Sequence, residues 1–454
     1  MTIAPGRPHS RGTTPSHRPR PVRGGIRSAV LLSVAALALA GCGGGSSPGA
    51  ATSSAPAADS NAPVTLTFVN AQDPGTFDKV IAGFTKENPN ITIKLQTLPF
   101  DDLNTTVQSR LGSKDASIDL YDVDEPRLAA FALRGYLADL SDLRAEGEGV
   151  IDPKAMAATT YEGKQYAMPR WTSTQLLYYN KGLLKKAGVA APSSDPTKPM
   201  TWEAVVEAGL AAQKAGARNG MTFEQVDRYY QLQPLAESAG GGPGLTGEGL
   251  LTPDVTNPGW IKAFSWYKST FDEKVAPRGV SPEQTGTLFA DGNTAFFAGG
   301  PWNAPLFDEA EVDYGVAPFP TFAGGKPVSS TGSWATGVSP FSANPEAAKK
   351  FIRYMTVNPT GAWEASSRNI PVQKEAFEKY LTEAAKGGGS AEDLAAIIRQ
   401  ELASNAVARP TSVGFVDFEA VMNKAFADIR NGAEPAARLQ QATEELDRVL
   451  AKYK

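Results

Sequence analysis

The sequence predicts an α/β fold in two lobes, with mainly parallel sheets covered by flanking helices. Strand and helix periodicities alternate over the first part of the globular region, an order typical of parallel sheets. About 390 residues follow a low-complexity segment, and this length exceeds what one hydrophobic core accommodates. The remainder is mostly helical with short strand-like pieces, so a second lobe is expected to follow the first.

Residues 1–41 have the pattern of a secretory signal peptide. Six arginines and no acidic residue precede an apolar stretch, 29–40, that is too short to span a bilayer. The run Leu39-Ala40-Gly41-Cys42 resembles the lipobox of bacterial lipoproteins, in which the cysteine is acylated and becomes the first residue. We therefore expect a lipid anchor at Cys42 on the outer face of the cytoplasmic membrane. Residues 42–62, rich in Gly, Ser, Ala and Pro, are expected to form a flexible tether.

Composition excludes several classes of chemistry from the expected mature chain. Cys42 is the only cysteine, and both histidines, His9 and His17, lie within the signal peptide. Disulfides, Cys/His zinc sites, cysteine nucleophiles and Ser-His-Asp triads are thereby excluded, and we expect no metal and no cofactor. Without the six signal arginines, 38 basic residues face 48 acidic ones, a net charge of about −10. Because phosphate binding needs a positive surface, no nucleic-acid partner is expected.

The first lobe is expected to be built from three repeats of strand and helix. Alternation or helical spacing of apolar residues predicts strands over 64–68, 91–98 and 118–123, and helices over 77–84, 103–111 and 126–134. In such sheets, ligands bind beyond the carboxyl ends of the strands. Gln72, Asp73 and Asp124 follow strand ends and are therefore candidate ligand residues.

Later elements are shorter strands separated by longer helices. Short strands are expected over 165–168, 174–179, 294–298, 314–317 and 333–338, and helical stripes over 202–210, 260–271, 351–355 and 439–450.

Two local patterns suggest enzymes, but both are weak. Residues 242–247 match G-x-G-x-x-G, yet they follow a helical segment instead of a strand, so a surface turn is favoured over a nucleotide site. Asp119, Asp122, Asp124 and Glu125 could include a carboxylate pair for glycoside hydrolysis. Since a strand end does not place two acids across one bond, capping or solvation is favoured for Asp119 and Asp122, and Asp124 is assigned to ligand binding.

Tryptophans separate into two groups by their position. The first group lies on helical stripes and is expected in the core: Trp202, Trp260 and Trp266. The second group lies at junctions rich in Gly, Pro, Ser or Thr: Trp171, Trp302 and Trp334. A flat aromatic face suits the C–H face of a pyranose, so the second group is expected to contact a ligand, with lobe packing as the alternative.

Arg409 precedes Pro410, which restricts the arginine to an extended conformation. A guanidinium held in this way can donate to two vicinal hydroxyls. An ion pair that closes the interface between the lobes is an equally supported role.

Four segments together resemble the extracellular solute-binding proteins of bacterial carbohydrate ABC importers, in the maltodextrin-binding and family 1 group. They are 171–181 (WTSTQLLYYNK), 288–297 (LFADGNTAFF), 300–302 (GPW) and 332–334 (GSW). With residues 397–400 and 406–410 included, the pattern is most similar to the trehalose-binding lipoprotein branch.

The resemblance implies a two-lobed periplasmic-binding-protein fold of the type II kind, with three crossings between the lobes. By position, the crossings are expected near Trp171, near 294–298 and near 331–334. The implied N-terminal lobe is 63–170 plus 295–332, and the implied C-terminal lobe is 171–294 plus 333–454.

By the same resemblance, Asp124 corresponds to the family's ligand-binding acid, Trp302 to its stacking platform and Arg409 to the arginine of the trehalose-type branch. Ser173 stands where that branch carries asparagine, and 125–127 also differ from it. The remaining ligand candidates at neighbouring positions are Asn303, Ser333 and Phe415.

We therefore expect a monomeric, lipid-anchored sugar-binding protein that captures a disaccharide or short α-glucoside and delivers it to the membrane subunits of an ABC permease. A secreted glycosidase or lyase would instead turn over a glycoside. A structural or adhesive lipoprotein would bind no small molecule, and it leaves the three junction tryptophans unexplained.

Overall fold

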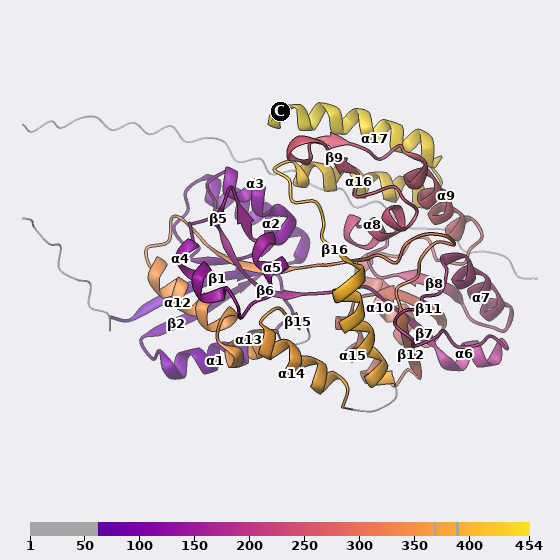
Figure 1. Cartoon of the computed structure of the whole chain (residues 1–454), viewed down its shortest axis with the longest axis horizontal. Coiled ribbons are helices and arrows are strands. Elements are labelled where there is room, and N and C mark those ends of the chain that lie inside the picture. The colour runs from indigo at the N-terminus through magenta and orange to yellow at the C-terminus, as the bar shows by residue number, and fades with distance from the viewer. Residues whose placement is uncertain (1–61, 367–368, 387–389) are drawn as a thin grey trace, which may run out of the picture. The chain divides into compact units, whose positions relative to one another are not determined.

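The computed structural model describes residues 62–366, 369–386 and 390–454 (Figure 1). The expected signal peptide, the lipid-attachment site at Cys42 and all but the last residue of the expected tether lie outside the described residues. Two main sheets, each covered by helices, form the two lobes (Figure 1). The expected α/β architecture is confirmed.

The first sheet begins as predicted and then becomes mixed. Its strands are ordered β15 (Ile370–Pro371), β6 (Ala167–Thr172), β14 (Trp334–Val338), β3 (Leu120–Asp124), β1 (Val64–Asn70) and β2 (Ile91–Thr97). β1 runs parallel to both β2 and β3, which confirms the predicted repeats. β14 runs antiparallel to β3 and β6, and β15 runs antiparallel to β6, so the sheet is not mainly parallel.

Helices of the first lobe cover both faces of this sheet. They are α1 (Asp78–Glu87), α2 (Phe100–Gly112), α3 (Leu128–Leu133), α4 (Ser141–Gly147), α5 (Pro153–Ala158), α12 (Pro345–Thr356) and α13 (Pro359–Ser366). Phe351 and Ile352 of α12 pack in one core with Leu66 and Phe68 of β1. Residues from the late part of the sequence thus complete the first core.

The second sheet has four strands, ordered β12 (Tyr314–Pro318), β7 (Leu176–Asn180), β11 (Thr294–Gly299) and β8 (Asn219–Phe223). Only the β11 and β8 pair is parallel. Its helices are α6 (Lys181–Lys186), α7 (Trp202–Lys214), α8 (Tyr229–Ser238), α9 (Pro258–Asp272), α10 (Pro282–Ala290), α11 (Ala304–Glu309), α15 (Ser390–Gln400), α16 (Phe415–Arg430) and α17 (Pro435–Leu450). Trp202 and Trp260 are fully buried in this lobe, as expected of core tryptophans.

Short elements connect these layers. Two-residue strand pairs are β4 (Thr160–Tyr161) with β5 (Lys164–Gln165), β9 (Leu245–Thr246) with β10 (Thr252–Pro253), and β13 (Ser329–Ser330) with β16 (Ala406–Val407). The remaining helical turns are η1 (Glu125–Arg127), η2 (Glu248–Leu250), η3 (Pro301–Asn303), the π-helical η4 (Glu401–Asn405) and η5 (Ala451–Tyr453), while α14 (Lys374–Ala384) follows β15. Residues 242–247, the G-x-G-x-x-G match, follow α8 and contain the short strand β9, so the strand-to-helix context of a nucleotide site is absent there.

The expected lobe boundaries require a correction. β11 lies between β7 and β8 with all six residues buried, so 294–299 is a central strand of the second lobe and not a crossing. Conversely, β14 pairs with β3 and β6, which places 334–338 in the first lobe. The segment 295–332, assigned to the first lobe, therefore belongs to the second, and the start of 333–454, assigned to the second lobe, belongs to the first. The assignment failed because a strand joins a sheet through its pairing partners, which its own sequence pattern does not specify.

Three crossings nevertheless connect the lobes. The chain leaves the first sheet between β6 and β7, at 173–175, and returns between β13 and β14, at 331–333. It leaves again after β15, since Ile397 and Ile398 of α15 pack in one core with Tyr178 of β7. The crossings expected near Trp171 and near 331–334 thus have counterparts in the structure, and the third lies after Pro371.

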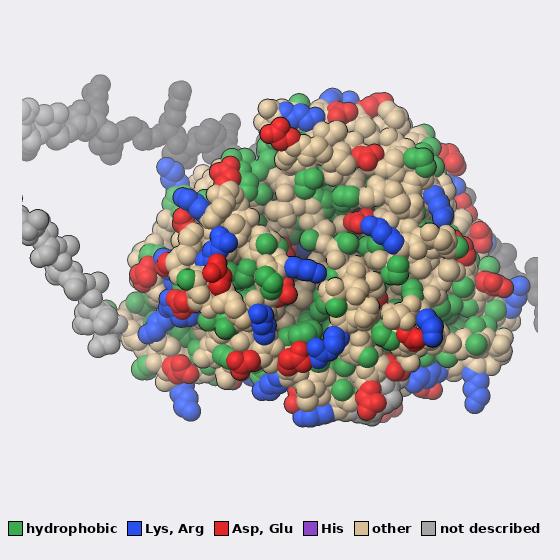
Figure 2. All heavy atoms as spheres, in the orientation of Figure 1, with side chains coloured by type: hydrophobic (Ala, Val, Ile, Leu, Met, Phe, Trp, Pro, Cys, Tyr) green, Lys and Arg blue, Asp and Glu red, His purple; other side chains and the backbone are tan. Residues whose placement is uncertain are grey.

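Charged side chains of both signs are interspersed over the visible face, without a large patch of one sign (Figure 2). In the described part of the chain, no helix is long and apolar enough to cross a membrane.

Candidate functional site

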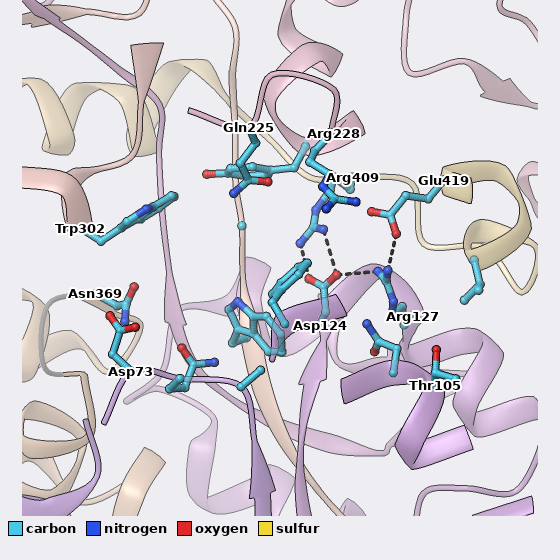
Figure 3. Close-up of a pocket in the computed structure, with 18 of the residues that line it drawn as sticks. Asp73, Thr105, Asp124, Arg127, Gln225, Arg228, Trp302, Asn369, Arg409 and Glu419 are labelled. Carbon is cyan, nitrogen blue, oxygen red and sulfur yellow. Dashed lines mark hydrogen bonds and ion pairs between the residues drawn. The ribbon is translucent and has the colours of Figure 1, made fainter. Parts of the chain in front are cut away.

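A cavity of about 780 Å³ lies between the two lobes, within the ~300–1,000 Å³ range of small-molecule sites (Figure 3). The first lobe contributes the loop 71–76 after β1, one face of α2, and residues near the ends of β3, β14 and β15. The second lobe contributes residues after β8 and β11, the segment after β16, and one face of α16. A ligand in this cavity would therefore touch both lobes at once.

Asp124 lies at the centre of the cavity, at the carboxyl end of β3. Its side chain is almost fully buried and accepts hydrogen bonds from two guanidinium groups. Arg409 Nη1 donates to Oδ2 at 3.0 Å and Arg409 Nη2 donates to Oδ1, while Arg127 Nη1 donates to Oδ2 at 2.7 Å. This arrangement fixes one carboxylate against two cations, and both Asp124 oxygens already accept hydrogen bonds.

Arg409 is held by its surroundings from several directions. Its guanidinium lies over the Tyr230 ring, 5.4 Å from the centroid. Burial acts to lower the pKa of Arg409, but the charge and hydrogen bonds of Asp124 outweigh it and raise the pKa. The Arg409 side chain therefore stays protonated, and the second of the two roles expected for it, an interlobe ion pair, is observed.

A second ion pair crosses the cavity next to the first. Arg127 belongs to η1 of the first lobe, and its Nη2 donates to Glu419 on α16 of the second lobe. The ring of Phe415 lies 5.9 Å from the Arg127 guanidinium carbon. Arg127 thus connects Asp124 to the second lobe.

Trp302 lies on the opposite side of the cavity from Glu419 (Figure 3). Trp302 Nε1 donates to Glu224, and the Glu224 carboxylate also accepts the Gly300 backbone N–H at 3.0 Å. A Cβ on Gly300 would lie 2.1 Å from the Trp302 ring, so the Gly300-Pro301-Trp302 sequence lets the indole cover its own backbone. The Tyr230 and Trp302 rings are 6.3 Å apart.

Burial raises the pKa of Glu224, while hydrogen bonds from Gly300, Asn303 and Trp302 act against this rise. Asn303 also donates to the Gly300 carbonyl at 3.1 Å. Asn303 therefore supports the Trp302 platform from behind and does not line the cavity.

Trp334 contributes a second aromatic surface, from the first lobe. Its ring meets that of Phe100 edge to face, with centroids 5.9 Å apart, and both residues line the cavity. Because Trp302 and Trp334 come from different lobes, the cavity presents aromatic rings from both sides.

A hinge contact joins two crossings beside the cavity. Ser173 Oγ and Tyr230 Oη are 2.9 Å apart, and Ser173 Oγ accepts the Gly332 N–H at 2.7 Å. A Cβ on Gly332 would lie 2.8 Å from the Tyr230 ring and 2.9 Å from Ser173 Oγ. Ser173 is therefore a hinge residue in this structure, one contact removed from the cavity.

Six of the eleven ligand residues expected from the sequence line the cavity: Gln72, Asp73, Asp124, Trp302, Trp334 and Arg409. The other five lie elsewhere. Trp171 is buried in the first core, 6.2 Å from the Phe77 ring and 4.1 Å from the Arg170 guanidinium carbon. Phe415 is buried in the second core, and Ser173, Asn303 and Ser333 are the supporting residues of the crossings and of η3.

Sequence reasoning missed most of the polar lining. The residues it did not select are Thr76, Asn104, Thr105, Gln108, Arg127, Gln225, Arg228, Tyr230, Asn369, Glu419 and Asn423. Asn104 and Gln108 are four residues apart on α2, and Glu419 and Asn423 are four apart on α16. Polar residues four positions apart on an amphipathic helix could have indicated these lining residues. A solvated helix face has the same pattern, so the signal does not distinguish the two.

A second cavity of about 390 Å³ adjoins the crossings and is lined mainly by apolar side chains. Glu125 and Ser333 both line it. Burial raises the pKa of Glu125 to about 8. The adjacent acids Asp124 and Glu125 thus line different cavities, and Asp119 and Asp122 line neither of the two. The four acids considered from the sequence therefore do not form a carboxylate pair in either cavity.

Among the described residues, no group of His, Cys, Asp and Glu is arranged to hold a metal ion.

Comparisons with known proteins agree with this geometry. Residues 70–362 match the family described as bacterial extracellular solute-binding protein. The chain is 27% identical over 317 residues to the maltodextrin-binding protein of Bacillus subtilis, covering 65% of this chain and 70% of that one. It is 30% identical over 387 residues to a probable ABC transporter-binding protein of Deinococcus radiodurans, covering 77% and 84%.

Solved structures share the fold. An ABC substrate-binding protein from Listeria monocytogenes in complex with cycloalternan superimposes with a TM-score of 0.75 at 24% identity, covering 86% of this chain and 99% of that one. The GacH receptor of Streptomyces glaucescens, solved without ligand and with acarbose, superimposes with a TM-score of 0.73 at 24% identity, covering 86% and 100%. The chain belongs to the bacterial extracellular solute-binding proteins, the binding components of ABC transporters, and is not an enzyme.

Proposed function

We propose that this protein captures a disaccharide or short α-glucoside, of the trehalose or maltose type, in the interlobe cavity and delivers it to an ABC permease. One observation carries the proposal: the same cavity is lined by aromatic rings from both lobes and by the buried ion pair of Asp124 and Arg409. Rings suit the apolar faces of a pyranose, and charged groups suit its hydroxyls. Relatives described as binding maltodextrin, maltooligosaccharides and galactooligosaccharides support a sugar as ligand.

The mechanism is closure of the lobes around the ligand. Because each lobe supplies part of the site, a bound sugar favours the arrangement in which Trp302 and Trp334 both reach it. Stacking and a few charged hydrogen bonds, less the cost of immobilising the ligand, support micromolar affinity, about −8 kcal/mol. Residues such as Asp73 and Gln72 at the end of β1 would orient hydroxyls at the rim.

The proposed location rests on the N-terminal sequence. We place the protein outside the cell as a monomer, anchored through acylated Cys42 on the outer face of the cytoplasmic membrane, where the permease takes up the sugar. Fractionation of cells that express Cys42→Ser should move the protein from the membrane to the soluble fraction. Retention of the variant in the membrane would contradict lipid anchoring.

The substrate class is tested with the mature protein against mono-, di- and trisaccharides, amino acids and short peptides. Thermal shift identifies ligands, and isothermal titration with recovery of the unchanged sugar establishes reversible binding. We expect stabilisation by α-linked glucose disaccharides. Stabilisation by amino acids or peptides, with every saccharide failing, would overturn the proposal.

A further inference from the structure

We infer that the ion pair between Arg127 and Glu419 divides the cavity and limits the length of saccharide that it accepts. The inference rests on the proposed sugar-binding function and deepens it. The pair joins η1 of the first lobe to α16 of the second, so it spans the gap that a ligand occupies. Figure 3 shows it on the side of the cavity opposite Trp302, with Asp124 and Arg409 between them.

The cavity has a different lining on the two sides of this pair. On the Trp302 side, the rings of Trp302 and Tyr230 lie 6.3 Å apart, and both residues line the cavity. The other side is formed by the facing surfaces of two helices, α2 with Asn104, Thr105 and Gln108, and α16 with Val416, Ala420 and Asn423. Thr105 lies beyond Arg127 in Figure 3. One interlobe bridge thus separates an aromatic compartment beside Trp302 from a compartment between α2 and α16.

Arg127 is fixed firmly enough to act as a partition. Its side chain is 9% exposed, and that of Glu419 is 14% exposed. Its Nη1 donates to Asp124 at 2.7 Å while its Nη2 donates to Glu419, so the planar guanidinium is held at both ends. A sugar chain that extends past Asp124 must stop at this bridge or separate the two charges, exchanging a largely buried ion pair for hydrogen bonds to neutral hydroxyls.

A more exposed contact between the lobes involves Gln108, which also lines the cavity. Arg134 donates to Gln108 of α2 and, at 3.2 Å, to Tyr453 Oη, which in turn donates to Asp417 of α16 at 2.8 Å. These groups are more exposed than the Arg127 and Glu419 pair, so this contact offers less resistance to a ligand. The Arg127 and Glu419 pair is therefore the decisive barrier.

The chain offers matched variants for a test. Glu419→Ala removes the bridge yet leaves Arg127 paired with Asp124, so no buried cation loses every partner. Glu419→Gln keeps the side-chain length and an oxygen that accepts from Arg127, and it is the isosteric control. Arg127→Ala removes the partition from the other side and leaves Asp124 paired with Arg409. Glu146→Ala removes an exposed ion pair with Arg353 on the first lobe and serves as a remote control.

Isothermal titration with glucose oligomers of two, three and four units then gives the ratio of Kd for the tetrasaccharide to Kd for the disaccharide. We expect wild type, Glu419→Gln and Glu146→Ala to favour the disaccharide by about tenfold or more. Glu419→Ala and Arg127→Ala should lower that ratio at least about tenfold, with thermal unfolding confirming that each variant is folded.

Two outcomes would overturn the inference. Equal ratios in wild type, Glu419→Ala and Arg127→Ala, with disaccharide binding intact, would reject the partition and leave the proposed function standing. A wild-type protein that binds the tetrasaccharide as tightly as the disaccharide would also reject the partition and leave the proposed function standing. Absence of binding to every oligomer would reject the proposed function itself, and the inference with it.

Discussion

Asp124 and Arg409 are 285 positions apart in the sequence and form a two-pronged ion pair across the interface of the lobes. Both are nearly inaccessible to solvent, and Arg127 binds the same carboxylate from the other side. One carboxylate is thereby shared by two buried cations, and Glu419 supplies a second negative charge to Arg127. We expect removal of Asp124 to be more damaging than removal of either cation alone.

Asp124→Ala should lower the free energy of unfolding by about 3–5 kcal/mol, since it leaves two buried guanidinium groups without their shared partner. Arg409→Ala should cost less, because Asp124 keeps Arg127. Urea denaturation measures both values. The exposed pair of Arg353 and Glu146 supplies a control, since Arg353→Ala should change stability by only about 0–1 kcal/mol. A larger loss in Arg409→Ala than in Asp124→Ala would contradict this ordering.

Glu125 should make stability depend on pH. Burial raises the pKa of Glu125 from 4.5 to about 8, so the folded protein keeps a proton that the unfolded chain has already released between these values. Stability contributed by this group is therefore lost as pH rises from about 4.5 to 8, by up to about 5 kcal/mol, and changes little outside that window.

Glu125→Gln mimics the protonated side chain and should remove this contribution. Urea midpoints of the variant and the parent are compared at pH 5, 7 and 9. Burial also raises the pKa of Glu401, to about 7, but Glu401 is present in both proteins, so the difference between them reports on Glu125 alone. The variant should gain stability over the parent as pH increases. A constant difference across the three pH values would mean that Glu125 does not titrate in this range.

Trp302→Ala should weaken saccharide binding by about tenfold or more, because it removes one aromatic face and exposes the carboxylate of Glu224 that the indole covers. Trp363→Ala is the matched control, since Trp363 is also partly exposed but lies on α13, packs against Lys379 and does not line the cavity. Calorimetric titration measures both. Equal losses of affinity in the two variants would show that Trp302 has no special role.

Gly332→Ala should lower stability by about 1–3 kcal/mol, because the new methyl group would overlap the Tyr230 ring and Ser173 Oγ at the second crossing. Gly182→Ala, in α6, meets its nearest neighbour at 3.4 Å and should be neutral or stabilising by up to about 1 kcal/mol. Thermal unfolding of the two variants distinguishes them. If both shifted equally, the close approach at Gly332 would carry no cost.

Local patterns in the sequence were sufficient for the individual elements and for part of the site. Alternation and helical spacing predicted β1, α1, β2, α2 and β3, since those periodicities come from the chain's own geometry. Asp124 could be selected because it follows a buried strand, and Trp302 and Trp334 because each lies at a junction that contains glycine.

Pairing of distant segments was decided only by the tertiary structure. The five-residue β14 shows a buried pattern that fits either sheet, and its place between β3 and β6 follows from hydrogen bonds to strands about 165 and 210 positions earlier. Trp171 and Trp302 both lie at junctions, yet one packs on Phe77 and Arg170 while the other faces the cavity. The sequence by itself determined many of the strands and helices and supplied candidate side chains for contact with a sugar. Only the folded chain decided which of them meet, because that depends on contacts between residues hundreds of positions apart.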